Sequence, residues 1–242
     1  MPIVTVSGQV GAGAREAGRL AAQQLGIDYV DQEILVQAAS TLGVPMESVV
    51  PFDERTASRG ERIASMLRRF FESSAAAGAA EPMLGSGGLD ILLSRTYGEA
   101  AADEGLQEVS GERYLATLSG IVNDLAAHGN VLIIGRGSQV ILKDHPGALH
   151  VLLVAPLDHR VAFIAAREDL SKEAAAKRVH DGDRGRAAFH HKFFKIDVDH
   201  PSHYHLTLNS ARFSLDDAAQ IISDAARRVA AHAAAGAPST NG

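Results

Sequence analysis

Three glycines close to the N-terminus are spaced as in a loop that binds phosphate. The stretch SGQVGAGAR, residues 7–15, follows an apolar run and precedes an alanine-rich segment with helical spacing. Backbone N–H groups in such a loop can bind phosphate oxygens, and the helix that follows adds the positive end of its dipole. Gly8 and Gly13 have the spacing of the motif GxxxxGK[ST], but Ala14 stands at its lysine position and Arg15 at its hydroxyl position. The alternative is a tight connection between a strand and a helix, with no ligand.

Arginines and aspartates suggest where a second phosphate would bind. Arg136 lies between two glycines directly after the apolar run VLII. Ligands of open parallel sheets bind beyond the carboxyl ends of the strands, where a guanidinium can grip phosphate with two hydrogen bonds. The stretch RVHDGDRGR at 178–186 could neutralise a transferring phosphoryl group. The alternatives are solvated charges in both places, and for Asp31 a role as the cap of the next helix.

Apolar runs and helical periodicity alternate along the chain. We predict strands at 3–6, 131–134, 150–154 and 205–208, and helices at 14–25, 32–42, 46–72, 110–128, 158–166, 171–178 and 214–234. Residues 28–31 are expected to form a short extended link, 73–88 a loop and 180–205 an irregular polar segment. Because the strands are continuous apolar runs, they predict an α/β fold with a parallel sheet covered on both faces.

Composition excludes several classes of function. The 242 residues suit one domain with a lid or an insertion, and the net charge of −6 argues against a general nucleic-acid binder. Without cysteine there is no disulfide, no thiolate zinc site and no cysteine nucleophile. No apolar run of transmembrane length and no secretory signal is recognisable, so we expect a cytoplasmic protein with no membrane partner. Histidines gather at 180–205 without the spaced pair and acid that a metal site requires.

Five stretches together resemble the cytidylate kinase-like branch of the P-loop nucleoside monophosphate kinases. They are SGQVGAGARE at 7–16, LGIDYVDQEIL at 25–35, IIGRGSQVIL at 133–142, DGDRGRAAF at 181–189 and PSHYHLTLNSARFSLDDAA at 201–219. The resemblance covers most of the chain but leaves 52–112 unmatched. It implies one P-loop kinase-like domain over 1–234, with a three-layer parallel-sheet core. It also implies a helical insertion for substrate at 46–112, an arginine-rich lid at 167–204 and a disordered tail at 235–242.

The same resemblance implies roles for individual residues. ATP phosphates would be bound by Gly8, Gly11, Gly13, Ala14 and Arg15. The monophosphate acceptor would be bound by Asp31, Arg136 and Arg160, and the residues of catalysis would be Asp183, Arg184, Arg186 and Arg15. Residues 209–212 would lie near the adenine. Magnesium would accompany ATP, and no metal site formed by the protein alone is expected.

The expected activity is transfer of the ATP γ-phosphate to a nucleoside monophosphate, CMP or dCMP. Cytidylate kinases have Gly-Lys in the loop, whereas this branch often has a small residue followed by Arg-Glu, as at 14–16. A catalytically weak or inactive nucleotide-binding sensor is the alternative that the missing lysine favours. A P-loop kinase for another small acceptor is the alternative that the unmatched segment favours. Oligomeric state is left open by the sequence.

Overall fold

The computed structural model describes residues 1–35, 97–102 and 108–236. The helix predicted at 46–72, the loop predicted at 73–88 and most of the predicted insertion at 46–112 lie outside the described residues. So does the end of the helix predicted at 32–42, whose first turn is formed by residues 32–35. Within the described ranges, no helix is long and apolar enough to cross a membrane.

Five parallel strands form one sheet in the order β2-β3-β1-β4-β5. Their bounds are β1 Ile3–Gly8, β2 Asp28–Val30, β3 Val131–Ile134, β4 Ala148–Val154 and β5 Leu206–Asn209. The predicted α/β class and the four predicted strands are confirmed, and the extended link predicted at 28–31 is the edge strand β2. The central strand β1 pairs with β3 and β4, so that Thr5 lies between Ile133 and His150.

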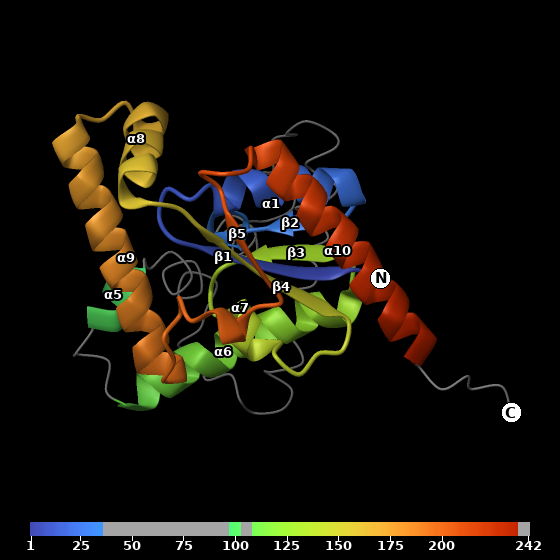
Figure 1. Cartoon of the computed structure of the whole chain (residues 1–242). Coiled ribbons are helices and arrows are strands. Elements are labelled where there is room, and N and C mark those ends of the chain that lie inside the picture. The colour runs from blue at the N-terminus through green and yellow to red at the C-terminus, as the bar shows by residue number, and fades with distance from the viewer. Residues whose placement is uncertain (36–96, 103–107, 237–242) are drawn as a thin grey trace, which may run out of the picture.

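Helices cover both faces of this sheet and one of its ends (Figure 1). One face carries α1 (Ala14–Leu25) and α10 (Leu215–Gly236), and the other carries α6 (Glu108–His128) and α7 (Ser138–Ile141). At one end of the sheet lie α5 (Tyr97–Ala102), α8 (Leu157–Glu168) and α9 (Lys172–Phe194), and a short 3-10 helix spans Pro201–His203. The architecture is therefore the predicted three-layer one. Because α10 runs to Gly236, the tail predicted from 235 does not begin there.

Helix α1 lies very close to the sheet because small residues face it. Ala17, Gly18 and Ala21 are buried, and a Cβ added at Gly18 would lie 2.7 Å from Cδ1 of Ile134. Close contact lets this short helix bury apolar surface without large side chains. It also fixes where the first turn of α1 stands relative to the ends of β1 and β3.

Of the irregular segment predicted at 180–205, residues 180–194 are helical instead, whereas 195–205 are irregular apart from the short 3-10 helix. Helix α9 begins after the N-cap Ser171 and continues through Gly182 and Gly185 to Phe194. In this helix the two glycines allow close approach: a Cβ at Gly185 would lie 2.9 Å from the backbone N of Gly98, and one at Gly182 would lie 2.7 Å from Val10. The prediction was wrong because glycines in a polar stretch were read as helix breakers, whereas here packing against α5 and the glycine loop holds the helix.

A polar pair lies buried in the middle of the sheet. His150 on β4 is 3% exposed, and its Nδ1 lies 2.8 Å from the hydroxyl of Thr5 on β1. Its Nε2 donates to the carbonyl of Leu142, so the Thr5 hydroxyl donates to Nδ1. Burial lowers the pKa of His150 to about 4, and the stacked ring of His205 lowers it further. His150 is therefore neutral at pH 7.

We expect the protein to lose stability as the pH falls from 6.5 to 4. Burial also lowers the pKa of His190 on α9 to about 4, and none of the described residues makes a hydrogen bond to its Nε2. The unfolded chain binds protons at both histidines below pH 6.5 while the folded chain does not, so the free energy of unfolding falls by about 3 kcal/mol per histidine. Urea denaturation across this range should show the fall. The loss of free energy of unfolding between pH 6.5 and 4 should be smaller by about 3 kcal/mol in His150→Gln and unchanged in a variant at the exposed His159. An equal loss in both variants would contradict the role of His150.

Candidate functional site

The glycine loop between β1 and α1 adopts a backbone conformation that favours glycine. Gly11 and Gly13 have φ values of 85° and 75°, in the left-handed region. Space is equally restricted, since a Cβ at Gly11 would lie 2.6 Å from the carbonyl oxygen of Arg160, and one at Gly13 would lie 2.5 Å from Leu215. Both conditions explain why this loop has glycine at these two positions.

The N–H groups at the start of α1 are available to an anion. Gly13 is the N-cap residue and no side chain caps the helix. Among the described residues, none accepts a hydrogen bond from the backbone N–H of Gly13, Ala14 or Arg15. Free donors at a helix N-terminus attract negative charge, and the helix dipole adds to that attraction. The loop can thus bind phosphate without the lysine of the motif.

A cavity of about 1030 Å³ opens beside this loop. Its wall combines residues from segments far apart in the sequence: Ser7, Gly8, Gly11, Gly13, Ala14, Arg15, Glu16, Asp31, Glu33, Tyr97, Gly135, Arg136, Arg167, Glu168, Arg178, Asp181 and Arg186 are among them. The volume is at the upper end of the range for small-molecule sites. It therefore has room for a ligand larger than a single phosphate group.

Arg136 enters this cavity from the end of β3. Gly135, Arg136 and Gly137 all have left-handed backbones, with φ values of 68°, 57° and 69°. For a residue other than glycine, this conformation costs about 1–3 kcal/mol and is typical of functional sites. Arg136 is 2% exposed, and its guanidinium donates to the hydroxyl of Tyr114 at 3.2 Å and lies over the ring of Tyr97. Surrounding aromatic groups thus hold a buried cation at the wall of the cavity.

Asp31 lines the cavity and also caps a helix. One carboxylate oxygen accepts the backbone N–H of Ile34 at 3.0 Å, and the other accepts the hydroxyl of Tyr29 at 3.1 Å. Burial raises the pKa of Tyr29, and the negative charge of Asp31 raises it further. Tyr29 therefore stays protonated and keeps donating. The capping role of Asp31 is present in the structure, and its role toward a substrate stays a prediction.

Arg160 lies beneath the glycine loop and does not line the cavity. It is 7% exposed, and it donates to the carbonyl of Val10 at 3.1 Å and to Asp183 at 2.5 Å. The second carboxylate oxygen of Asp183 accepts the backbone N–H of Val10 at 2.9 Å. The ion pair of Arg160 and Asp183 thus binds both the carbonyl and the N–H of Val10. We call Arg160, Asp183 and Val10 the loop clamp.

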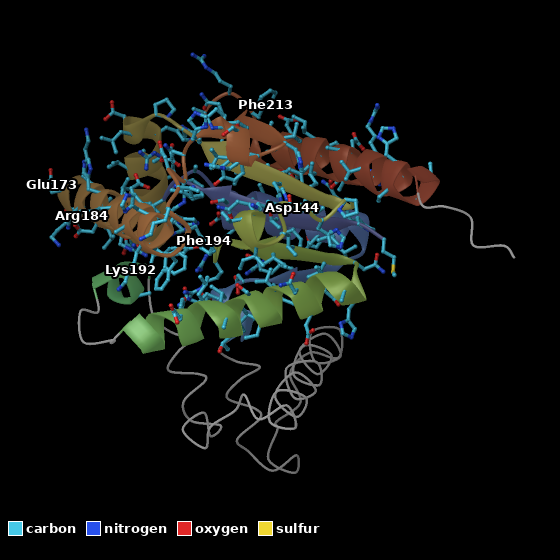
Figure 2. The ribbon with its side chains drawn as sticks, turned by 90° about the horizontal axis from the view of Figure 1, so that it is seen from below. Asp144, Glu173, Arg184, Lys192, Phe194 and Phe213 are labelled. Atoms are coloured by element: carbon cyan, nitrogen blue, oxygen red, sulfur yellow. The ribbon has the colours of Figure 1, made fainter. Side chains whose placement is uncertain are left out.

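The two remaining lid arginines lie on different sides of α9. Arg186 is 4% exposed, lines the cavity, and donates to Asp199 at 2.6 Å and to the hydroxyl of Ser7 at 3.0 Å. The side chain of Arg184 is 80% exposed, pairs with Asp181 and is not among the lining residues. Figure 2 shows Arg184 at the outer side of the helix. The structure therefore brings Arg186, but not Arg184, to the candidate site.

Several residues of this site were not predicted from the sequence. They are Ser7, Glu16, Tyr97, Tyr114, Arg167, Glu168 and Asp199. Arg15, which was predicted, lines the cavity and donates to Glu33 at 2.7 Å. Among the residues that the structure describes, no group of three or more histidines and carboxylates is arranged to hold a metal ion. A magnesium ion at this site would therefore depend on nucleotide phosphates and water for most of its ligands.

A sequence model of the cytidylate kinase-like family matches residues 3–212. The chain belongs to this family. Among curated proteins, it is 27% identical over 104 residues to the cytidylate kinase of Methanocaldococcus jannaschii, and 29% identical over 105 residues to that of Aeropyrum pernix. These matches cover 42% and 43% of this chain, and 58% and 60% of the two relatives.

Two further similarities are to a protein named as a different enzyme and to an uncharacterised protein. A uronate isomerase of Corynebacterium glutamicum is 26% identical over 99 residues, which is 41% of this chain and 19% of the isomerase. A solved structure of an uncharacterised protein from Eubacterium ventriosum matches with a TM-score of 0.58 and 12% identity, over 94% of this chain and 99% of that one. At that identity the likeness concerns the fold alone. The family match over residues 3–212 confirms the predicted resemblance to the cytidylate kinase-like family.

Proposed function

We propose that this member of the cytidylate kinase-like family transfers the γ-phosphate of ATP to a nucleoside monophosphate, CMP or dCMP. One cavity supports this proposal most strongly. The free N–H groups of the glycine loop lie at its wall together with Arg136, from the neighbouring strand β3. Such a cavity can hold a donor and an acceptor phosphate together, which phosphoryl transfer requires.

The chain's own groups would act by positioning and by charge. The loop amides would hold the donor phosphates, and Arg136 would hold the acceptor phosphate. An acceptor oxygen would then attack the γ-phosphorus as the bond to the β–γ bridging oxygen breaks, and ADP would leave without a covalent enzyme intermediate. Magnesium would arrive with ATP and neutralise part of the phosphate charge. Arg186, held by Asp199 and Ser7, would add positive charge beside the reacting group.

A nucleotide-binding sensor without turnover is the second candidate. Ala14 in place of a lysine and the outward position of Arg184 favour it. Both features reduce the positive charge near the γ-phosphate. A kinase for another small acceptor is the third candidate, since residues 52–112 carry no stretch that resembles the family.

A coupled assay of ADP formation separates these candidates. CMP, dCMP, UMP, AMP and GMP should be tested beside a reaction without acceptor, with ATP binding measured by calorimetry in parallel. We expect the highest kcat/KM with CMP or dCMP. If ATP binds but no acceptor gives ADP, the kinase proposal is wrong and the nucleotide-binding sensor is favoured. Turnover with none of the nucleotides but with another hydroxyl or phosphate compound would favour the third candidate.

A further inference from the structure

The loop lacks the cation that a lysine at position 14 would bring, yet five arginines of the described residues line the cavity. Three of them donate to groups outside α1: Arg15 to Glu33, Arg136 to Tyr114, and Arg186 to Asp199 and Ser7. The other two, Arg167 and Arg178, lie close to Glu168 at the end of α8. A replacement for the lysine should therefore be sought on this wall.

Arg167 is anchored to the first turn of α1. Its Nη1 donates to Glu16 at 3.0 Å, and Glu16 is the third residue of that helix. Its Nη2 donates to Glu168 at 2.5 Å, and the guanidinium lies 5.7 Å from the ring centroid of Phe163. The first turn of α1 also carries the free N–H groups of the loop. Two carboxylates and a ring thus hold the cation next to the anion site.

The guanidinium keeps donors for a ligand while these bonds stay in place. It has five N–H donors, and the bonds to Glu16 and Glu168 use one on each terminal nitrogen. Its side chain is 37% exposed and lines the cavity. Arg178, which pairs with Glu168 at 3.7 Å, partly offsets the second carboxylate. A phosphate can therefore bind Arg167 without displacing either glutamate.

We propose that Arg167 supplies to the terminal phosphates of ATP the charge that a lysine at position 14 would supply, and that Glu16 and Glu168 position it. This inference rests on the proposed function, because it names a group that binds the donor nucleotide. It differs from a purely structural role of the ion pairs, which would tie α8 to α1 and leave nucleotides unaffected. The two roles predict different results for ATP and AMP.

Calorimetry on the full chain tests the proposal with Arg167→Ala and Arg167→Gln, the second of which keeps the side-chain stem. We expect both variants to bind ATP roughly 10- to 100-fold more weakly, since a charge-assisted bond is lost. AMP, which lacks the terminal phosphates, should change by less than about threefold. Ala14→Lys introduced into Arg167→Ala should recover most of the ATP affinity, because it returns the cation to the loop.

Arg227→Ala is the matched control. Arg227 on α10 donates to Asp224 on the same helix and to the carbonyl of Gln24 on α1. Like Arg167 it links a carboxylate to α1, but it does not line the cavity. Its loss should leave both affinities unchanged. Unchanged ATP affinity in the Arg167 variants, or an equal loss for ATP and AMP, would overturn the role of Arg167 and leave the proposed function standing. Absence of ATP binding in the unaltered protein would overturn both.

Discussion

Arg136→Ala should weaken binding of the acceptor nucleotide by roughly 100-fold or more and change ATP binding by less than about threefold. The guanidinium is buried at the cavity wall and is already held by aromatic groups, so little ordering is required when phosphate binds. Its two-pronged geometry has no equivalent in lysine. Arg136→Lys should therefore recover little of the acceptor affinity.

Arg136→Gly separates the effect of losing the guanidinium on acceptor binding from the effect of the substitution on stability. The residue has a φ of 57°, which glycine adopts without strain. The glycine variant should be more stable than the alanine variant by about 1 kcal/mol, yet bind the acceptor equally poorly. Calorimetry with CMP and ATP, together with urea denaturation, measures both quantities. Equal losses for the two nucleotides, or no loss, would contradict the acceptor role of Arg136.

Asp183→Ala should destabilise the fold by about 2–3 kcal/mol and weaken ATP binding as well. It would leave Arg160, which is 7% exposed, without its carboxylate partner and would free the backbone N–H of Val10. The Asp183 side chain is 28% exposed, so water would screen part of the loss. A loosened loop would then present its N–H groups to phosphate in more than one arrangement.

A double-mutant cycle checks whether the loop clamp acts as a unit. Arg160→Met combined with Asp183→Leu removes both charges, and the pair should be less destabilised than the sum of the single variants. Asp183→Asn should lie between the wild type and Asp183→Ala, because its amide oxygen can still accept from Val10. Strictly additive single effects in urea denaturation would show that Arg160 and Asp183 act independently.

The central part of the fold could be predicted because its signals are local. The apolar runs that became β1, β3 and β4 are buried on both faces, and continuous apolar composition indicates such strands. Arg136 was predicted because two glycines after a strand show where the backbone must turn. Strand β2 was missed as a strand because its sequence, Asp-Tyr-Val, is short and polar at one end.

Which of the predicted lid residues face the cavity could not be decided without knowing that 172–194 is one helix. Residues two positions apart on a helix point about 200° apart, so Arg184 and Arg186 cannot both face the cavity. Asp183 and Arg186, three positions apart, share one side of α9. Arg167 comes directly after the helix predicted at 158–166, and its partner Glu16 is 151 positions away. Only the tertiary structure brings that pair together.

Helix α9 makes three separate attachments to the site from one continuous backbone. Asp183 binds the glycine loop, Arg186 binds Ser7 at the end of β1, and Phe194 lies against Gly137 beside Arg136. They are spread over about 16 Å of helix, so a rigid movement of α9 away from the sheet must break all three at once. Withdrawal of this helix as a rigid body would consequently be all-or-none. A ligand that binds more tightly to the attached helix at any one of the three positions would stabilise all three attachments together.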